Sequence, residues 1–242
     1  MIAEGLSDSG LVRENNQDFY FLSRDLNFPL YIVADGMGGH NAGNIASNMA
    51  VSIIEDIFLF NRKKLDTEKG VFSTIKEAIK TANYKIYNKS SDDKSCSGMG
   101  TTVTLVYILN DTVYIGHVGD SRAYYIKNTS IEQITEDHSL VYELIKKGNI
   151  TTEEGENHPR KNAITRAVGT NDIVKIDIYT KEYKKGHKLL ICSDGLTDMV
   201  NNNRILDIVN RDEDIMSKCK KLIKDAKDNG GLDNITIILL EF

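Results

Sequence analysis

The chain has 242 residues, of which 40% are hydrophobic and 27% charged, a balance that is ordinary for one large globular domain. Its net charge of −5 argues against nucleic acid as the main partner, because a phosphate backbone attracts a basic face. The three cysteines are far apart, and no apolar run nears the roughly 18 residues of a membrane helix. We therefore expect a cytoplasmic protein with reduced thiols, no signal peptide and no membrane insertion.

The first elements of the chain are short strands with a polar connection. Ile2 to Asp8 is predicted to form the first strand, and Phe19 to Leu22 the second. The polar stretch between them places Arg13 on a loop and Asp18 at the amino end of the second strand.

The next apolar run, Tyr31 to Ala34, leads directly into Asp35 and a cluster of glycines. The run is short and rich in β-branched residues, which predicts a buried strand that the glycines end. Glycine also lets the main chain approach a ligand closely. Asp35 therefore either marks an ordinary Asp-Gly turn or faces a bound group, and the later motifs decide between the two.

Two long helices follow, and both carry broad apolar stripes. The first begins at Ala42 and repeats apolar residues every four positions as far as Phe58. The second has its apolar positions between Phe72 and Ile86. We expect an antiparallel helix pair that covers one face of a sheet.

The middle of the chain predicts an antiparallel meander that follows an exposed loop at residues 90–97. Four strands are predicted in close succession, at residues 101–109, 112–118, 123–126 and 131–134. Asn110-Asp111 between the first two is a tight hairpin signal. The second of these strands delivers another acid beside a glycine, Asp120.

Residues from about 139 to 170 have a weaker pattern. A short helix is predicted from Leu140 and is closed by Gly148, and polar residues with Pro159 follow. We interpret the segment as a small insertion over the sheet edge, within a single domain that spans residues 1–242.

The last part of the chain alternates strands and helices without short βαβ crossovers. Strands are predicted at 174–178, 188–192 and 235–240, and helices at 205–209 and 215–226. Asp194 follows the second of these strands, and Asp233 precedes the last. The element order predicts an α+β fold of mostly antiparallel sheets with helices packed outside.

Acids recur at the ends of the predicted strands. Three end apolar runs and two precede them, namely Asp35, Asp120 and Asp194, and Asp18 and Asp233. In antiparallel sheets the carboxyl end of one strand lies beside the amino end of the next, so these acids can gather at one edge. Such a group needs a counter-charge, because like charges raise one another's pKa.

A divalent cation is the natural counter-charge. No histidine or cysteine cluster accompanies the acids, and oxygen ligands suit Mg²⁺ or Mn²⁺, with Gly36 able to lend its carbonyl. Two such ions can deprotonate a shared water and stabilise charge on a phosphoryl group. Arg13 can grip two phosphate oxygens with its planar guanidinium, although an arginine on a loop is usually only a solvated charge.

These motifs resemble those of the metal-dependent protein serine/threonine phosphatases of the protein phosphatase 2C type, especially the small bacterial ones. The matching motifs follow the family order along nearly the whole chain, at residues 7–13 with 16–18, 33–40, 98–102, 119–122, 193–196 and 233–236. The resemblance implies a four-layer sandwich of two antiparallel sheets flanked on both sides by helix pairs. It implies hydrolysis of phosphoserine and phosphothreonine by a water or hydroxide that bridges two Mn²⁺ or Mg²⁺ ions.

The resemblance also implies roles for the acids. Asp35, the Gly36 carbonyl, Asp194 and Asp233 match the residues that hold the two-metal centre. Asp120, together with Asp194, matches the position that holds a weaker third ion in bacterial members.

Further matches concern residues around the metals. Asp18 matches an acid close to the ions, and Arg13 matches the arginine that grips phosphate. The segment from about 139 to 170 matches a mobile flap near the substrate.

Two positions depart from the eukaryotic pattern. Gln17 stands where those proteins have an acid, and Met37 stands where they have a histidine proposed as general acid. A serine alkoxide is a poor leaving group, so some group must protonate it. We favour a metal-bound water as the donor, with His40 in the same loop as the alternative.

Two other classes of function are disfavoured. A catalytically dead scaffold that binds phosphoproteins or a kinase does not explain why the expected metal-binding acids are retained. A kinase or other nucleotide enzyme is disfavoured because this sequence has no GxxxxGKS/T loop, and the glycines after Asp35 do not complete a GxGxxG loop. The resemblance implies phosphorylated proteins as partners of a signalling enzyme, a serine/threonine kinase among them, and we expect a monomer.

Overall fold

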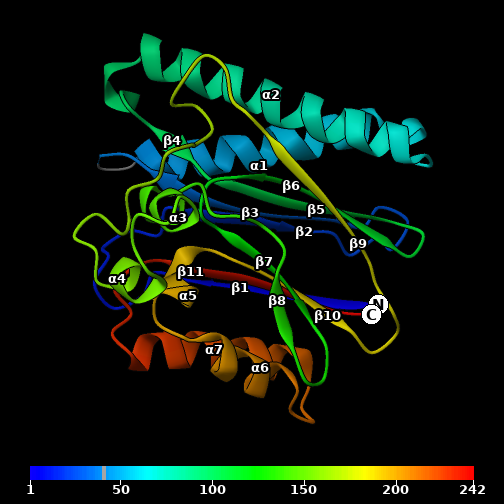
Figure 1. The fold of residues 1–242 in the computed structure, drawn as a ribbon. Helices are drawn as coiled ribbons and strands as arrows, with labels where there is room; N and C mark the ends of the chain where they lie inside the picture. Colours follow the sequence, from blue (N-terminus) through cyan, green and yellow to red (C-terminus); the bar gives the residue numbers. More distant parts are fainter. Residues whose placement is uncertain (40–41) are drawn as a thin grey trace.

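Two antiparallel β-sheets pack face to face, and helices cover both outer faces (Figure 1). The computed structural model describes residues 1–39 and 42–242. The predicted α+β sandwich of two antiparallel sheets with helices outside is confirmed.

Each sheet is built from strands that are distant in the sequence. The first has the order β1-β11-β10-β7-β8 and contains β1 (Ile2–Asp8), β11 (Ile235–Glu241), β10 (Lys188–Cys192), β7 (Arg122–Ile126) and β8 (Ile131–Gln133). The second has the order β2-β3-β5-β6-β9 and contains β2 (Asp18–Leu22), β3 (Leu30–Met37), β5 (Val103–Leu109), β6 (Thr112–Val118) and β9 (Asp177–Glu182). A short strand, β4 (Gly100–Thr101), pairs with the end of β3.

The helices form the outer layers. The second sheet is covered by α1 (Ala42–Phe60) and α2 (Glu68–Asp92), which short 3-10 turns follow at Arg62–Lys64 and Lys94–Cys96. The first sheet is covered by α5 (Asp194–Thr197), α6 (Asn202–Val209) and α7 (Ile215–Asp228). In the described part of the chain, no helix is both long and apolar enough to cross a membrane.

Strand β3 shows why its sequence is a continuous apolar run. Tyr31 and Val33 pack into the interface between the two sheets. Leu30, Ile32 and Ala34 alternate with them and pack against the α1 and α2 side. Because both faces of the strand are buried, no polar alternation is possible, and the strand carries Asp35 to the edge of the sandwich.

Strand β3 extends further than its glycines predict. It continues past Asp35 to Met37, because Gly36 and Met37 pair with Thr101 and Gly100 of β4. Asp35 therefore lies within a paired strand, and the glycines do not end the strand at this acid.

Two other boundaries also differ from the prediction. Helix α2 runs to Asp92, so residues 90–97 form a helix end and a 3-10 turn where a loop was expected; the segment is mostly exposed as predicted, apart from the buried Cys96. Strand β9 begins at Asp177, later than the predicted 174. In both places local polarity or alternation was a weaker determinant than the neighbouring packing.

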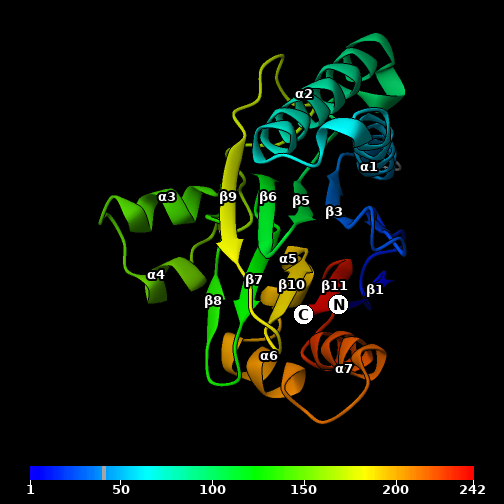
Figure 2. The same cartoon turned by 90° about the vertical axis from the view of Figure 1, so that its right-hand side faces the viewer.

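The segment 139–170 lies outside the two sheets (Figure 2). It contains the predicted helix α3 (Leu140–Lys146) and a helix that was not predicted, α4 (Thr152–Glu156). The start of α4 is a capping box, in which Thr151 and Glu154 satisfy each other's backbone N–H groups.

Candidate active site

The structure brings the predicted acids to one edge of the sandwich. Asp18 on β2 lies directly opposite Asp35 on β3. In the other sheet, Asp194 follows the end of β10, and Asp233 precedes β11, the antiparallel neighbour of β10. Asp120 follows β6, and its charge acts on Asp35 and Asp194. Acids from both sheets thus share one electrostatic environment.

Hydrogen bonds on both sides of its peptide fix the position of Asp35. Its N–H donates to Thr102 Oγ1 at 2.9 Å, and its carbonyl oxygen accepts from the Thr102 N–H at 2.8 Å. At the next position, a Cβ on Gly36 would come within 2.1 Å of the Gly43 carbonyl oxygen and 2.5 Å of that of Gln17. The main chain can lie this close to helix α1 only because position 36 has no side chain.

Asp18 is buried, and only half of its carboxylate has a partner. Ser193 Oγ donates to Asp18 Oδ2 at 2.8 Å, and the Thr236 N–H donates to Ser193 Oγ at 2.9 Å. Asp18 Oδ1 has no hydrogen-bond partner. Burial raises the pKa of Asp18 to about 6, although hydrogen bonds from Thr236 and Ser193 act in the opposite direction.

The pKa values of three other, partly buried acids are shifted in the same direction. Burial, followed by the charges of neighbouring acids, raises the pKa values of Asp35 and Asp194 well above their ordinary range. Burial, followed by the charge of Asp137, raises the pKa of Asp120 to about 7. The side-chain Oδ1 of Asp194 is also buried without a partner. Buried carboxylates normally have a cationic partner. Among residues 1–39 and 42–242, Arg13 and Arg122, whose charges act on these acids, form their ion pairs with Asp233 and Asp137 instead.

The donor set suits a cation whose coordination is completed by water. The unpaired oxygens of Asp18 and Asp194 are the hard donors that Mg²⁺ and Mn²⁺ prefer. Among residues 1–39 and 42–242, no three His, Cys, Asp or Glu side chains are grouped so that they could hold a metal ion. The acids therefore fit such an ion only together with the Gly36 carbonyl oxygen and water, which Mg²⁺ retains readily.

Arg13 lies at the same edge on a loop that Asn234 holds in place. Arg13 Nη2 donates to Asp233 Oδ2 at 2.7 Å, and the arginine side chain is 55% exposed. The Gln17 N–H donates to Asn234 Oδ1 at 2.8 Å, and Asn234 Nδ2 donates to the Asn15 carbonyl oxygen at 3.0 Å. Sequence reasoning gave Asn234 no role of its own, and its place directly after Asp233 is the signal that could have found it.

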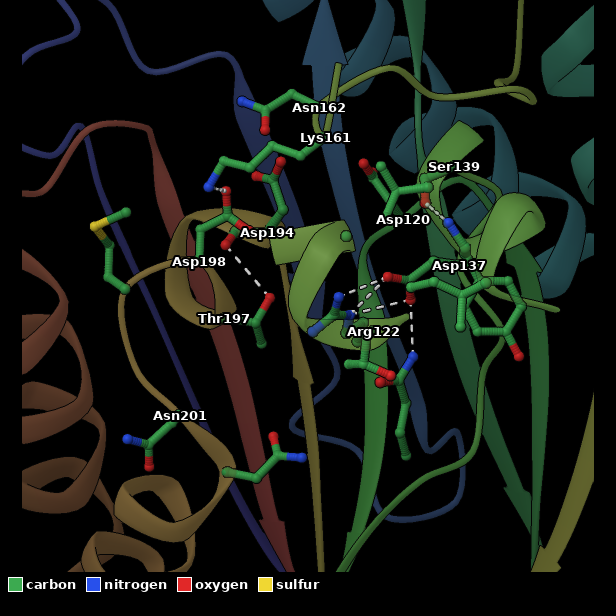
Figure 3. Close-up of a pocket in the computed structure, with 18 of the residues that line it drawn as sticks. Asp120, Arg122, Asp137, Ser139, Lys161, Asn162, Asp194, Thr197, Asp198 and Asn201 are labelled. Atoms are coloured by element: carbon green, nitrogen blue, oxygen red, sulfur yellow. Dashed lines mark hydrogen bonds and ion pairs between the residues drawn. The ribbon is translucent and has the colours of Figure 1, made fainter. Parts of the chain in front are cut away.

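A cavity of about 760 Å³ opens beside the acids (Figure 3). Asp120 and Asp194 form part of its wall, and residues of the segment 139–170 form another part. Lys161 of this segment reaches toward Asp198, with its Nζ 3.4 Å from Asp198 Oδ2 (Figure 3). The cavity therefore connects the acids with the insertion, where part of a substrate can lie.

The two positions that depart from the eukaryotic pattern, Gln17 and Met37, lie close to the glycines that follow Asp35. Gln17 Nε2 donates to the Gly38 carbonyl oxygen at 3.5 Å, so its side chain lies beside the glycines. Met37 is partly buried at the end of β3. His40, the candidate proton donor, lies outside the described residues.

A family model and curated proteins match this chain over most of its length. The model described as protein phosphatase 2C matches residues 12–228. The serine/threonine phosphatase stp of Listeria welshimeri is 39% identical over 243 residues, which cover 100% of this chain and 96% of that protein. The protein phosphatase PhpP of Streptococcus pneumoniae is 40% identical over 237 residues, which cover 97% of this chain and 95% of that protein.

Solved structures of two bacterial serine/threonine phosphatases also match nearly the whole chain. The serine/threonine phosphatase of S. agalactiae has a TM-score of 0.91 at 38% identity, over 98% of each chain. The Mycobacterium tuberculosis serine/threonine phosphatase PstP/Ppp has a TM-score of 0.89 at 32% identity, over 100% of this chain and 98% of that one.

Proposed function

The chain belongs to the protein phosphatase 2C family and is a protein serine/threonine phosphatase, and we propose that it acts with two divalent cations, Mn²⁺ or Mg²⁺. The residues proposed to hold them are Asp35, the Gly36 carbonyl, Asp194 and Asp233, with Asp120 and Asp194 for a weaker third ion. The observation that carries this proposal is the group of acids whose pKa values are raised, among which Asp18 and Asp194 each have a buried oxygen without a hydrogen-bond partner. The bound cations would supply the missing counter-charge and a water that attacks phosphorus directly.

The chain's own residues prepare the site for this chemistry. The backbone of Asp35 is held on both sides by Thr102, which fixes its main chain at the edge of the sandwich. Ser193 orients Asp18 by a hydrogen bond of 2.8 Å, which leaves the second carboxylate oxygen free for the site. Arg13 grips two oxygens of the substrate phosphoryl group, and its contact with Asp233 keeps its guanidinium at the edge.

The cavity is the proposed place of the substrate. It adjoins Asp120 and Asp194 and is lined on its far side by residues of the segment 139–170. This segment acts as a flap over the phosphorylated peptide. We infer further that the substrates are phosphorylated cytoplasmic proteins, that a serine/threonine kinase is one partner, and that the enzyme is a monomer.

Metal removal tests the proposed function. Treatment with EDTA is expected to lower the hydrolysis of a phosphothreonine peptide by more than about 100-fold, because several kcal/mol of charge stabilisation is lost. Added Mn²⁺ should restore activity, and release of inorganic phosphate measures both effects. A protein that hydrolyses the peptide equally well after exhaustive chelation, or not at all with metal present, contradicts the proposal.

Replacement of His40 distinguishes the two candidate proton donors, a metal-bound water and His40. We expect His40→Ala to slow peptide hydrolysis by less than about tenfold, since a general acid contributes about 100-fold or more. The comparison substrate is 4-nitrophenyl phosphate, whose leaving group departs without a proton. A large loss on the phosphothreonine peptide with an unchanged rate on 4-nitrophenyl phosphate would instead assign the proton transfer to His40.

A further inference from the structure

The His138 residue holds the peptide that leads into Asp120. The Gly119 N–H donates to His138 Nδ1 at 2.9 Å, and the His138 N–H donates to the Gly119 carbonyl oxygen at 2.8 Å. Gly119 has a φ of 115°, and a Cβ there would come within 2.5 Å of Thr102. A glycine has no side chain that could restrain its backbone, so these two hydrogen bonds fix the peptide that precedes Asp120.

The surroundings of the imidazole select one tautomer. Because Nδ1 accepts from the Gly119 N–H, the ring proton is on Nε2, which donates to Asp177 Oδ2 at 2.9 Å. Arg166 Nη1 donates to the same carboxylate oxygen at 3.1 Å and holds it in place. Burial lowers the pKa of His138, and the charge of Arg166 adds to this shift while the hydrogen bond to Asp177 opposes it. Because Nδ1 accepts a hydrogen bond, the ring carries its single proton on Nε2.

The same residue joins the two ends of the segment 139–170. The Thr165 N–H donates to the His138 carbonyl oxygen at 2.7 Å. Ser139 and Ile164 form an isolated antiparallel bridge next to it. Arg166, at the returning end, has its Nη1 2.8 Å from His138 Nε2 and donates to the Asp177 carboxylate that the imidazole also contacts. The base of this segment is thus anchored on the side chain that also holds Gly119.

We propose that His138 is a positioning residue for Asp120, whose imidazole, oriented by Asp177, couples the base of the segment 139–170 to the aspartate beside the cavity. This inference rests on the proposed function only where it concerns the role of Asp120 toward a cation. The hydrogen bonds themselves join protein groups only, so they are tested on protein without added metal. The imidazole's partners lie 19 to 39 positions away in the sequence, so no local motif indicates this role.

A matched pair of substitutions separates the two sides of the ring. Asn places an amide oxygen where His138 Nδ1 lies, so His138→Asn keeps an acceptor for the Gly119 N–H and loses the contact with Asp177. Gln reaches the position of Nε2, so His138→Gln keeps the contact with Asp177 and leaves the Gly119 N–H without its acceptor. His187→Gln is the control, since His187 contacts Tyr125 on a different part of the molecule.

The first measurement is made on the metal-free protein. Nitrogen chemical shifts should show His138 protonated on Nε2, and the Gly119 amide should exchange slowly with solvent. We expect exchange of the Gly119 amide to accelerate by about tenfold or more in His138→Gln, because the hydrogen bond from Gly119 to residue 138 is lost. In His138→Asn the acceleration should be less than about threefold. An Nδ1-protonated ring, or equal exchange in the two variants, would overturn the proposal whatever the enzyme's activity.

The second measurement is the dependence of turnover on Mn²⁺. Loss of a group that orients a metal ligand costs about 10-fold to 100-fold in metal affinity or activity, so His138→Gln should need that much more Mn²⁺ or lose that much in kcat. His138→Asn should lie closer to the wild type. Faster Gly119 exchange with an unchanged Mn²⁺ dependence and kcat would refute the positioning role. An inactive wild type with the expected Gly119 exchange pattern would refute the proposed function and leave the hydrogen bonds standing.

Discussion

Asp35→Asn is expected to abolish hydrolysis of a phosphothreonine peptide and to raise the melting temperature of the metal-free protein. Asp35 is partly buried, and its pKa is raised by burial and by neighbouring acids that include Asp18 and Asp194. An asparagine has nearly the same shape, but it removes one charge from the group and one anionic ligand from the proposed metal site. We expect activity to fall by more than about 1000-fold, because several kcal/mol of electrostatic stabilisation depends on the cations.

The gain in stability has a separate physical cause. Without cations, an ionised Asp35 is repelled by its neighbours, and a protonated one must take up a proton that it would release in the unfolded chain. Relief of either cost by roughly 1–2 kcal/mol should raise the melting temperature by about 2–6 °C in a domain of this size. Differential scanning calorimetry of metal-free protein measures the shift. Mn²⁺ should stabilise the wild type strongly and the variant much less, because the stabilisation follows binding.

The pH dependence of the metal-free protein checks the same electrostatic argument. Folding raises the pKa values of Asp18 to about 6 and of Asp120 to about 7, so above about pH 4 the folded state holds protons that the unfolded chain has released. The free energy of unfolding should therefore fall as pH rises from about 4 to 7. Asp212→Asn, at an exposed position, is the control and should change neither activity nor this slope. An unchanged or lower melting temperature in Asp35→Asn would contradict the repulsion on which the metal proposal depends.

Periodicity and strand-end acids were sufficient to predict most of the architecture. Tyr31, Ile32 and Val33 form a continuous apolar run in the sequence. The run reflects the burial of both faces of β3 in the sandwich. The gathering of acids at one edge also followed from pattern, since antiparallel pairing places Asp18 opposite Asp35. The sequence therefore indicated the candidate site as a set of acids at strand ends.

Contacts between distant segments could not be predicted in this way. The hydrogen bonds from Asn234 to the loop that carries Arg13 span more than 200 positions. Ser193 supports Asp18 across the two sheets, and a serine before an acid has no distinctive pattern. The extension of β3 beyond Asp35 likewise depends on β4, a strand of only two residues that is too short to show periodicity. Such details arise from tertiary pairing, which local sequence does not encode.

Arg13→Ala is expected to lower kcat/KM for a phosphothreonine peptide by about 10-fold to 150-fold, while Arg13→Lys should lose less. Hydrogen bonds to a charged group contribute about 1.5–3 kcal/mol, and the forked guanidinium can make two of them to one phosphoryl group. Lysine keeps the positive charge but lacks the forked guanidinium, so the decrease in kcat/KM for Arg13→Lys should be smaller than that for Arg13→Ala. The half-exposed side chain suggests that it can leave Asp233 to meet a substrate, since it is not buried against the protein.

The contact of Arg13 with Asp233 allows a different explanation, which a second measurement separates from phosphate binding. If the arginine grips phosphate, inorganic phosphate should inhibit Arg13→Ala at least about tenfold less strongly, and the Mn²⁺ requirement should change by less than about threefold. If the arginine only neutralises Asp233, the result should be the reverse, because the metal site and not the product would sense its loss. Arg24→Ala is the matched control, since Arg24 pairs with Glu4 on β1 and lies in neither the acid group nor the cavity lining. A loss of activity with unchanged phosphate inhibition and a shifted Mn²⁺ requirement would assign Arg13 to the support of Asp233 and remove it from phosphate binding.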